Sequence, residues 1–174
     1  MGYDVSGSGE ITIPAQNIEA AYGAILDLNR LPDDAKRGGS WKEGERVSSH
    51  FSWMPADLSE FKSLNSLLEA LGFECAVEKD GVTVLNYPNS KTGQEEVFFA
   101  AIAPYVESGG YMFWDGEDGA YWKWTFVDGQ MFEHEGIREY SDGTPVTIAT
   151  YVQGQLAMYE AVHDMFKLAT KTEG

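Results

Sequence analysis

The sequence contains one cysteine, Cys75, and no second cysteine with which it could form an internal disulfide. A lone cysteine suits a reducing compartment, so we expect a cytoplasmic protein with Cys75 as a buried structural thiol. Apolar runs of about 18 residues, the length needed to cross a bilayer as a helix, are also missing. The N-terminus lacks a basic region followed by an apolar run. We therefore expect neither a membrane span nor a secretory signal.

Basic residues are scarce. The chain has 12 lysines and arginines against 28 aspartates and glutamates, which gives a formal net charge of −16. The imbalance is strongest over residues 92–166, which hold 13 acidic residues and two basic ones. A field of this sign repels nucleic-acid phosphates and anionic membranes and attracts basic protein surfaces. We therefore expect no direct binding to nucleic acid or membrane, and a protein partner with a basic surface.

Recognisable catalytic and metal-binding motifs are missing as well. His50, His134 and His163 have no second histidine or cysteine at the spacing of a metal site. The sequence has no serine or cysteine nucleophile motif, and nothing raises one carboxylate pair above the others as a hydrolase pair. We expect no metal and no cofactor. An enzyme, in the form of a hydrolase, is the least favoured function.

The aromatic residues are concentrated in residues 109–137, GGYMFWDGEDGAYWKWTFVDGQMFEHEGI. Two glycine-containing turns, Gly116–Gly119 and Asp128-Gly129, predict a meander of three short antiparallel strands. With Gly116–Gly119 as a four-residue loop, the alternation of side chains predicts one face as a wall of the core. The residues predicted on this face are Tyr111, Phe113, Trp122, Trp124, Phe126 and Met131.

The opposite face of the predicted meander would carry Met112, Trp114, Tyr121, Lys123, Thr125, Phe132 and His134. Because this face is more apolar than a solvated sheet face usually is, we expect a helix or a partner to cover it, and a helix is the more common arrangement. The register also places Glu133 beside Trp124 on the inner face, a conflict that a bulge after Gly129 would relieve. It predicts that Trp124 is buried and that Trp114 is substantially more exposed.

Apolar periodicity outside the meander predicts four helices: from Asn17 to about Leu28, from Leu58 to Leu71, over about 94–103 and over about 151–170. A strand is expected near Glu10–Ile13, after a flexible Ser-Gly-Ser-Gly segment, and a hairpin around Asp80-Gly81. Residues 30–50 are polar and glycine-rich, which indicates a loop or a mobile insertion. The predicted class is α+β: a single domain of residues 1–174 with a mainly antiparallel sheet, including the aromatic meander, packed by about four helices.

The opening MGYDVSGSGEITI and the later GEDGAYWKWTFVDG together resemble a group of uncharacterised small acidic proteins of bacteriophages and bacterial mobile elements. The shared pattern is a Met-Gly-Tyr start, a Gly-Glu-Asp-Gly turn, a Trp-x-Trp-x-Phe strand and an Asp-Gly turn. The matching positions are Met1, Gly2, Tyr3, Gly7, Gly9, Gly116, Glu117, Asp118, Gly119, Trp122, Trp124, Phe126, Asp128 and Gly129. The resemblance implies a phage or mobile-element origin, hence the host cytoplasm, and it implies no catalytic residues.

The sequence favours two non-enzymatic functions over an enzymatic one. The leading hypothesis is a non-enzymatic acidic protein-binding factor, such as a nucleic-acid mimic that inhibits a host defence or DNA-handling protein. Its candidate contact residues are Glu117, Asp118, Asp128, Glu133, Glu135, Glu139 and Asp142. The alternative is a small-ligand or nucleotide-binding module, in which aromatic rings stack on the ligand and cations meet a phosphate. Its candidate residues are Trp41, Trp114, Tyr121, Lys36 and Arg37. The sequence does not predict an oligomeric state.

Overall fold

The computed structural model describes residues 3–137 and Glu139. The first elements are β1 (Asp4–Pro14), η1 (Ala15–Asn17), α1 (Ile18–Asp27), η2 (Leu28–Arg30), η3 (Asp33–Ala35), β2 (Gly38–Lys42) and β3 (Glu45–Ser49). They are followed by η4 (Leu58–Glu60), α2 (Leu64–Leu71), β4 (Glu74–Val77), β5 (Gly81–Lys91), α3 (Glu95–Ile102) and η5 (Ala103–Tyr105). The last described elements are β6 (Tyr111–Gly116), β7 (Tyr121–Val127) and β8 (Gln130–Gly136).

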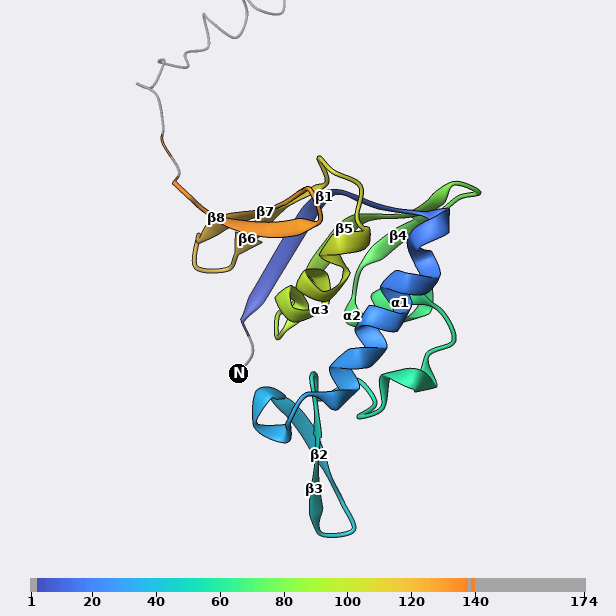
Figure 1. The fold of residues 1–174 in the computed structure, drawn as a ribbon. Coiled ribbons are helices and arrows are strands. Elements are labelled where there is room, and N and C mark those ends of the chain that lie inside the picture. Colours follow the sequence, from blue (N-terminus) through green and yellow to red (C-terminus); the bar gives the residue numbers. More distant parts are fainter. Residues whose placement is uncertain (1–2, 138, 140–174) are drawn as a thin grey trace, which may run out of the picture. The chain divides into compact units, whose positions relative to one another are not determined.

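Six strands form one antiparallel sheet in the order β4-β5-β1-β6-β7-β8. The helices α1, α2 and α3 all lie on one side of this sheet, which we call the inner face (Figure 1). The predicted α+β class with a mainly antiparallel sheet is therefore confirmed. The helices α1, α2 and α3 correspond to the first three of the four predicted helices. The fourth helix, predicted over about 151–170, lies outside the described residues, and the single domain of residues 1–174 stays a prediction.

The core lies between these helices and the inner face of the sheet. Alternate residues of the strands supply one wall, because side chains of a strand point to opposite faces. The fully buried residues of the core include Ile11 and Ile13 of β1, Val84 and Tyr87 of β5, Leu67 and Leu68 of α2, and Phe98 and Phe99 of α3. Cys75 of β4 packs half-buried against this core, and burial raises the pKa of its thiol to about 12. The thiol therefore stays protonated at neutral pH.

Helix α2 is shorter than its apolar stripe predicts, because two caps divide the segment. Asp57 accepts a hydrogen bond from the Ser59 N–H at 2.9 Å and starts only the short η4. The α-helix itself begins after Ser63, whose side chain forms a reciprocal capping box with Ser66. Gly72 ends the helix with a φ of 107°, as the sequence predicts.

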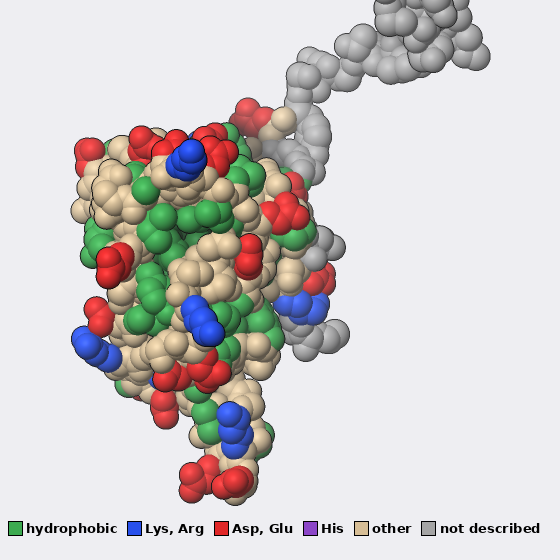
Figure 2. All heavy atoms as spheres, turned by 90° about the vertical axis from the view of Figure 1, so that its right-hand side faces the viewer, with side chains coloured by type: hydrophobic (Ala, Val, Ile, Leu, Met, Phe, Trp, Pro, Cys, Tyr) green, Lys and Arg blue, Asp and Glu red, His purple; other side chains and the backbone are tan. Residues whose placement is uncertain are grey.

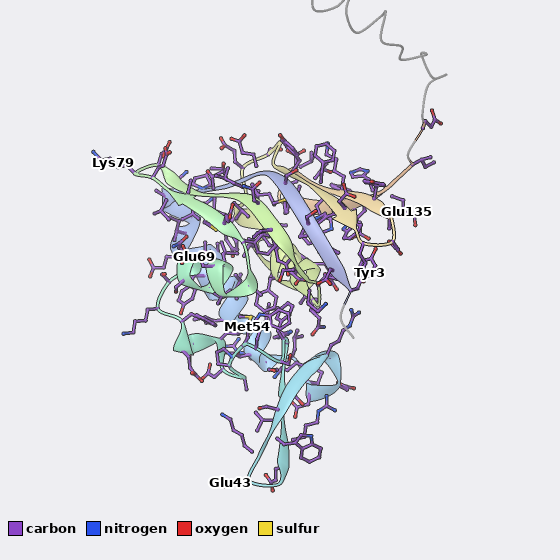
Figure 3. The ribbon with its side chains drawn as sticks, turned by 180° about the vertical axis from the view of Figure 1, so that it is seen from behind. Tyr3, Glu43, Met54, Glu69, Lys79 and Glu135 are labelled. Atoms are coloured by element: carbon purple, nitrogen blue, oxygen red, sulfur yellow. The ribbon has the colours of Figure 1, made fainter. Side chains whose placement is uncertain are left out.

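Residues 38–49 form a two-stranded hairpin of β2 and β3, where the sequence predicts a loop or a mobile insertion. Glu43 and Gly44 both have positive φ angles, 52° and 88°, the signature of a tight two-residue hairpin turn. We call this hairpin the arm, since it pairs with no strand of the main sheet. Figure 3 shows Glu43 at its tip, at the opposite end of the structure from Lys79 in the β4–β5 turn. The supposedly flexible Ser6–Gly9 segment instead lies within β1.

Candidate functional site

The first strand of the β6–β8 meander is shifted by one residue from its predicted register. Trp114 pairs with Trp122 and Phe113 with Lys123. Trp114 is only 3% exposed and faces the core, whereas Phe113 is 51% exposed on the opposite, outer face. The predicted positions of both side chains are therefore wrong. The predicted burial of Trp124 is confirmed at 3% exposure.

The length of the β6–β7 turn explains this shift. The Gly116 N–H donates to the Ala120 carbonyl at 2.9 Å, which leaves a three-residue loop, Glu117–Gly119, where the prediction has four residues. Gly119 closes the loop with a φ of 84°, the left-handed conformation that three-residue hairpin loops require. Removing one residue from the loop turns every side chain of β6 to the other face. Met112 is therefore buried, and Tyr111 lies on the outer face with Phe113.

Strand β8 keeps its predicted register and contains no bulge. Phe126 pairs with Met131, and Trp124 pairs with Glu133. The conflict predicted at Glu133 is resolved by a hydrogen bond, because the Trp124 Nε1–H donates to a Glu133 carboxylate oxygen at 2.9 Å. The edge position of β8 leaves Glu133 itself exposed. A charged acceptor thus satisfies the N–H of a buried indole.

On the outer face, strands β6–β8 present several aromatic rings and one lysine, Lys123. The Lys123 Nζ lies 4.6 Å from the centre of the Phe113 ring and 5.2 Å from that of Tyr111, within the range of cation–π attraction. The outward-facing rings, which we call the aromatic half, are Tyr111, Phe113, Tyr121 and Phe132. Within residues 3–137 all three α-helices lie on the inner face, so none provides the expected cover.

Small residues of β1 hollow the outer face beside the aromatic half. Ser6 pairs with Asp115 and Ser8 with Phe113. Gly7, between them, faces the core, where a Cβ would come within 3.1 Å of the Trp114 ring, so the short side chains of Ser6 and Ser8 are the ones that leave space on the outer face. The resulting hollow has a volume of about 450 Å³ and extends across β1, β6, β7 and β8. It provides room for a partner side chain beside exposed rings.

Carboxylates gather over the other half of the outer face. Glu10 of β1, Glu78 and Asp80 of the β4–β5 turn, and Glu107 after η5 line a hollow of about 670 Å³. We call these four residues the acidic half; it adjoins the aromatic half because Glu10 pairs with Tyr111. Figure 2 shows acidic side chains along the upper edge, the end at which the β4–β5 turn lies in Figure 1. Sequence reasoning missed all four, since only the strand order brings their three segments together.

The acidic candidates from the sequence lie apart from one another. Glu117 and Asp118 lie in the β6–β7 turn and Asp128 in the β7–β8 turn, at opposite ends of β7. Glu133 and Glu135 lie on the inner-face side of β8, because their partners across the strands face the core. The remaining two candidates are Glu139, which is exposed, and Asp142, which lies outside the described residues.

The side chains of the alternative ligand site are not brought together either. Trp41 lies on the arm with 76% of its surface exposed. Trp114 lies in the core, and Tyr121 lies on the outer face. Lys36 is buried at the base of the arm, and Arg37 is exposed beside it. The predicted aromatic clamp with a cationic phosphate contact is therefore absent from the described part of the chain.

The two segments that carry the resemblance contact each other. The Tyr3 hydroxyl donates a hydrogen bond to the Asp118 carboxylate in the β6–β7 turn. Asp118 also accepts the Ala120 N–H at 3.0 Å. A Cβ at Gly116 would collide with the Tyr3 hydroxyl, so the ring needs a glycine at that place. This contact ties the start of β1 to the turn.

Tyr3→Phe is expected to raise the pKa of Asp118. The hydrogen bond from Tyr3 is the main reason that the Asp118 pKa lies below its usual value, with the Ala120 N–H as a second cause. A carboxylate with a lowered pKa stabilises the folded state above its unfolded pKa, and this contribution is lost as pH falls through the folded pKa. Removing the donor should flatten that part of the pH–stability curve. Carboxyl NMR titration measures the change, and an unaltered Asp118 pKa in Tyr3→Phe would contradict the contact.

The described residues contain neither a cluster of metal ligands nor a membrane-spanning helix. Within residues 3–137 and Glu139, no three His, Cys, Asp or Glu side chains are arranged to hold a metal ion. None of the helices in this part of the chain is both long and apolar enough to cross a membrane. Comparisons with protein-family models, with curated proteins and with solved structures give no match to this chain.

Proposed function

We propose that the protein is a non-enzymatic binding protein that engages a basic surface of a partner protein through the outer face of its sheet. The observation that carries the proposal is the adjacency of the acidic half and the aromatic half on this face. Carboxylates attract lysine and arginine side chains, and exposed rings accept both their cationic heads and their aliphatic stems. The hollow of about 450 Å³ gives such side chains room.

The charge of the whole chain supports the same proposal. A net charge of −16 produces a long-range field that steers basic partners toward the protein. Such steering mainly accelerates association, and salt weakens it because mobile ions screen the field. The hollow and the rings then supply the short-range contacts that charge alone does not provide.

A nucleic-acid-binding protein is the class of partner that fits best. The binding surface of such a protein presents lysine and arginine side chains to the phosphates of nucleic acid. The carboxylates of the acidic half would take the place of those phosphates. In this form the protein is a nucleic-acid mimic that inhibits a host defence or DNA-handling protein. The resemblance to phage and mobile-element proteins supports this form, although it names no target.

Neutralising two of the four carboxylates of the acidic half should weaken binding to a basic probe by about three- to tenfold, as expected for the loss of two exposed charge pairs. The test variant is Glu10→Gln with Glu107→Gln. The matched control is Glu43→Gln with Glu45→Gln at the tip of the arm, which changes the net charge equally. Fluorescence anisotropy with a labelled arginine-rich peptide measures the affinity at low and at physiological salt. Equal loss in both double variants would mean that only net charge matters, and the outer face would lose its role.

A competition experiment tests the mimic form directly. The protein should displace a labelled DNA duplex from a basic DNA-binding protein, and the Glu10→Gln, Glu107→Gln variant should displace it less. Phe113→Ala should reduce displacement with little change in its salt dependence, because the ring contributes no charge. Failure of the wild-type protein to displace DNA at any salt concentration would remove mimicry from the proposal.

A further inference from the structure

The base of the arm contains buried polar side chains that the proposed function does not use. Four of them, each at most 9% exposed, are Lys36, Ser49, His50 and Gln94. Gln94, just before α3, holds the chain that leads into β2. Its Nε2 donates to the Ala35 carbonyl at 2.9 Å, and its Oε1 accepts the Arg37 N–H at 2.9 Å. The orientation of the arm on the body therefore depends on this cluster.

His50 lies at the other root of the arm, directly after β3. Its ring packs edge-on against Phe98 with the ring centres 5.1 Å apart, and its Nε2 lies 3.5 Å from the Leu28 carbonyl. The second nitrogen, Nδ1, is buried, and within the described residues no hydrogen-bond partner reaches it. The nearby Gln94 side chain could accept from a protonated ring only through its Oε1, which already accepts the Arg37 N–H at 2.9 Å. Since a protonated imidazole carries two N–H donors, the second would have to compete with the Arg37 N–H for the Gln94 oxygen or remain buried without an acceptor.

The charges around His50 also oppose its protonation. Lys36 faces the ring and repels a second positive charge. Burial is the main cause that keeps the pKa of His50 below its ordinary value; the Leu28 carbonyl opposes it, Lys36 adds to it, and Gln94 has a smaller opposing effect. The carboxylates of the surrounding elements are engaged elsewhere. Asp33 lies 3.7 Å from the Lys36 Nζ, and Glu95 accepts hydrogen bonds from Thr92 and Gly93. The Arg37 guanidinium lies 3.9 Å from Glu96.

We propose that His50 is a pH-dependent latch, which holds the base of the arm on the body while it is neutral and releases the arm when it is protonated. Above about pH 7.5 the imidazole is neutral in the docked and in the released state, so pH does not alter the balance. As pH falls further, the released state takes up the proton first, and docking weakens. A single proton limits this change to about tenfold at pH 5.5.

Amide hydrogen exchange at about pH 7.5 and about pH 5.5 tests the latch, after correction for the intrinsic pH dependence of exchange. The Arg37 amide reports release, because its partner is the Gln94 side chain. The Met112 amide, in the interior strand β6, reports global unfolding. We expect the protection of Arg37 to fall several-fold at the lower pH while that of Met112 is unchanged.

The variant His50→Phe keeps a ring against Phe98 but cannot bind a proton, so the pH effect on Arg37 should disappear. His134→Gln removes an exposed histidine of β8 and should retain the full effect. If His50→Phe does not fold, NMR titration of the His50 ring in the wild-type protein replaces it, and its midpoint must coincide with that of arm release. The latch is overturned if Arg37 protection does not depend on pH, if it is lost together with that of Met112, or if the dependence survives in His50→Phe.

Discussion

Trp114→Ala is expected to lower the free energy of unfolding by about 3–5 kcal/mol, the range for large aromatic truncations in a core. The indole is 3% exposed and contacts four other rings, of which Phe73 lies edge-on at 6.1 Å. Its ring centre lies 4.6 Å from Trp124 and 5.3 Å from Tyr87, and it stacks on Trp122 at 5.7 Å with 7° between the planes. Removing the ring would open a cavity at the centre of this cluster. Chemical denaturation of the variant and the wild-type protein measures the loss.

The neighbouring Phe113 provides the control, because it lies on the opposite face of the same strand and is 51% exposed. Phe113→Ala should cost about 1 kcal/mol or less, mainly through its contact with Lys123. Trp114→Phe should fall between the two, since it keeps an aromatic ring and removes a buried N–H without a partner in the described structure. A larger cost for Phe113→Ala than for Trp114→Ala would mean that the register of β6 is wrong.

Glu95→Ala should lower the free energy of unfolding by about 2–4 kcal/mol, through unsatisfied buried donors and a small cavity. The Glu95 carboxylate is 1% exposed at the start of α3. It accepts hydrogen bonds from the Thr92 hydroxyl at 2.9 Å and the Gly93 N–H at 2.8 Å. The Tyr87 hydroxyl has one proton and two acceptors within reach, the Lys91 carbonyl at 2.7 Å and the Glu95 carboxylate at 3.1 Å. This carboxylate therefore fastens the end of β5 to the first turn of α3.

Two further variants separate the hydrogen bonds of Glu95 from its charge. Glu95→Gln retains one carbonyl oxygen as an acceptor and should cost roughly half as much as Glu95→Ala. Glu96→Ala changes the next residue, whose side chain is 42% exposed and lies 3.9 Å from Arg37, and it should cost less than about 1 kcal/mol. Similar melting curves for Glu95→Ala and Glu96→Ala would refute the structural role assigned to Glu95.

Features set by neighbouring residues could be predicted from the sequence. The apolar stripe of α2 and its Gly72 stop, and the Asp128-Gly129 turn that pairs Phe126 with Met131, are all found in the structure. The face of Trp114 could not be predicted, because it depends on whether the β6–β7 loop has three or four residues. Both lengths suit the same Gly-Glu-Asp-Gly sequence, and a difference of one residue exchanges the two faces of a strand.

The acidic half could not be predicted because its residues are distant along the chain. Glu10 and Glu107 meet Glu78 and Asp80 only after β1 has paired with β5 on one side and β6 on the other. Periodicity predicts strands but not which strands are neighbours. The acidic candidates predicted from the sequence all lie within residues 117–142, inside the stretch 92–166 that holds 13 acidic residues and two basic ones. The structure shows that local density along the chain does not determine which carboxylates share a surface.

The place of β1 in the sheet has a consequence for synthesis on the ribosome. Of the six strands of this sheet, β1 is made first, yet it is an interior strand whose two neighbours are β5 and β6. The first of these neighbours, β5, is translated about 4–14 s later at usual elongation rates. Until β5 has been made, Ile11 and Ile13, which pair with Val84 and Val82 and are completely buried in the finished protein, have no strand to join. The nascent chain must therefore keep these two isoleucines from aggregating, whether by transient collapse or by a chaperone, until β5 has been made.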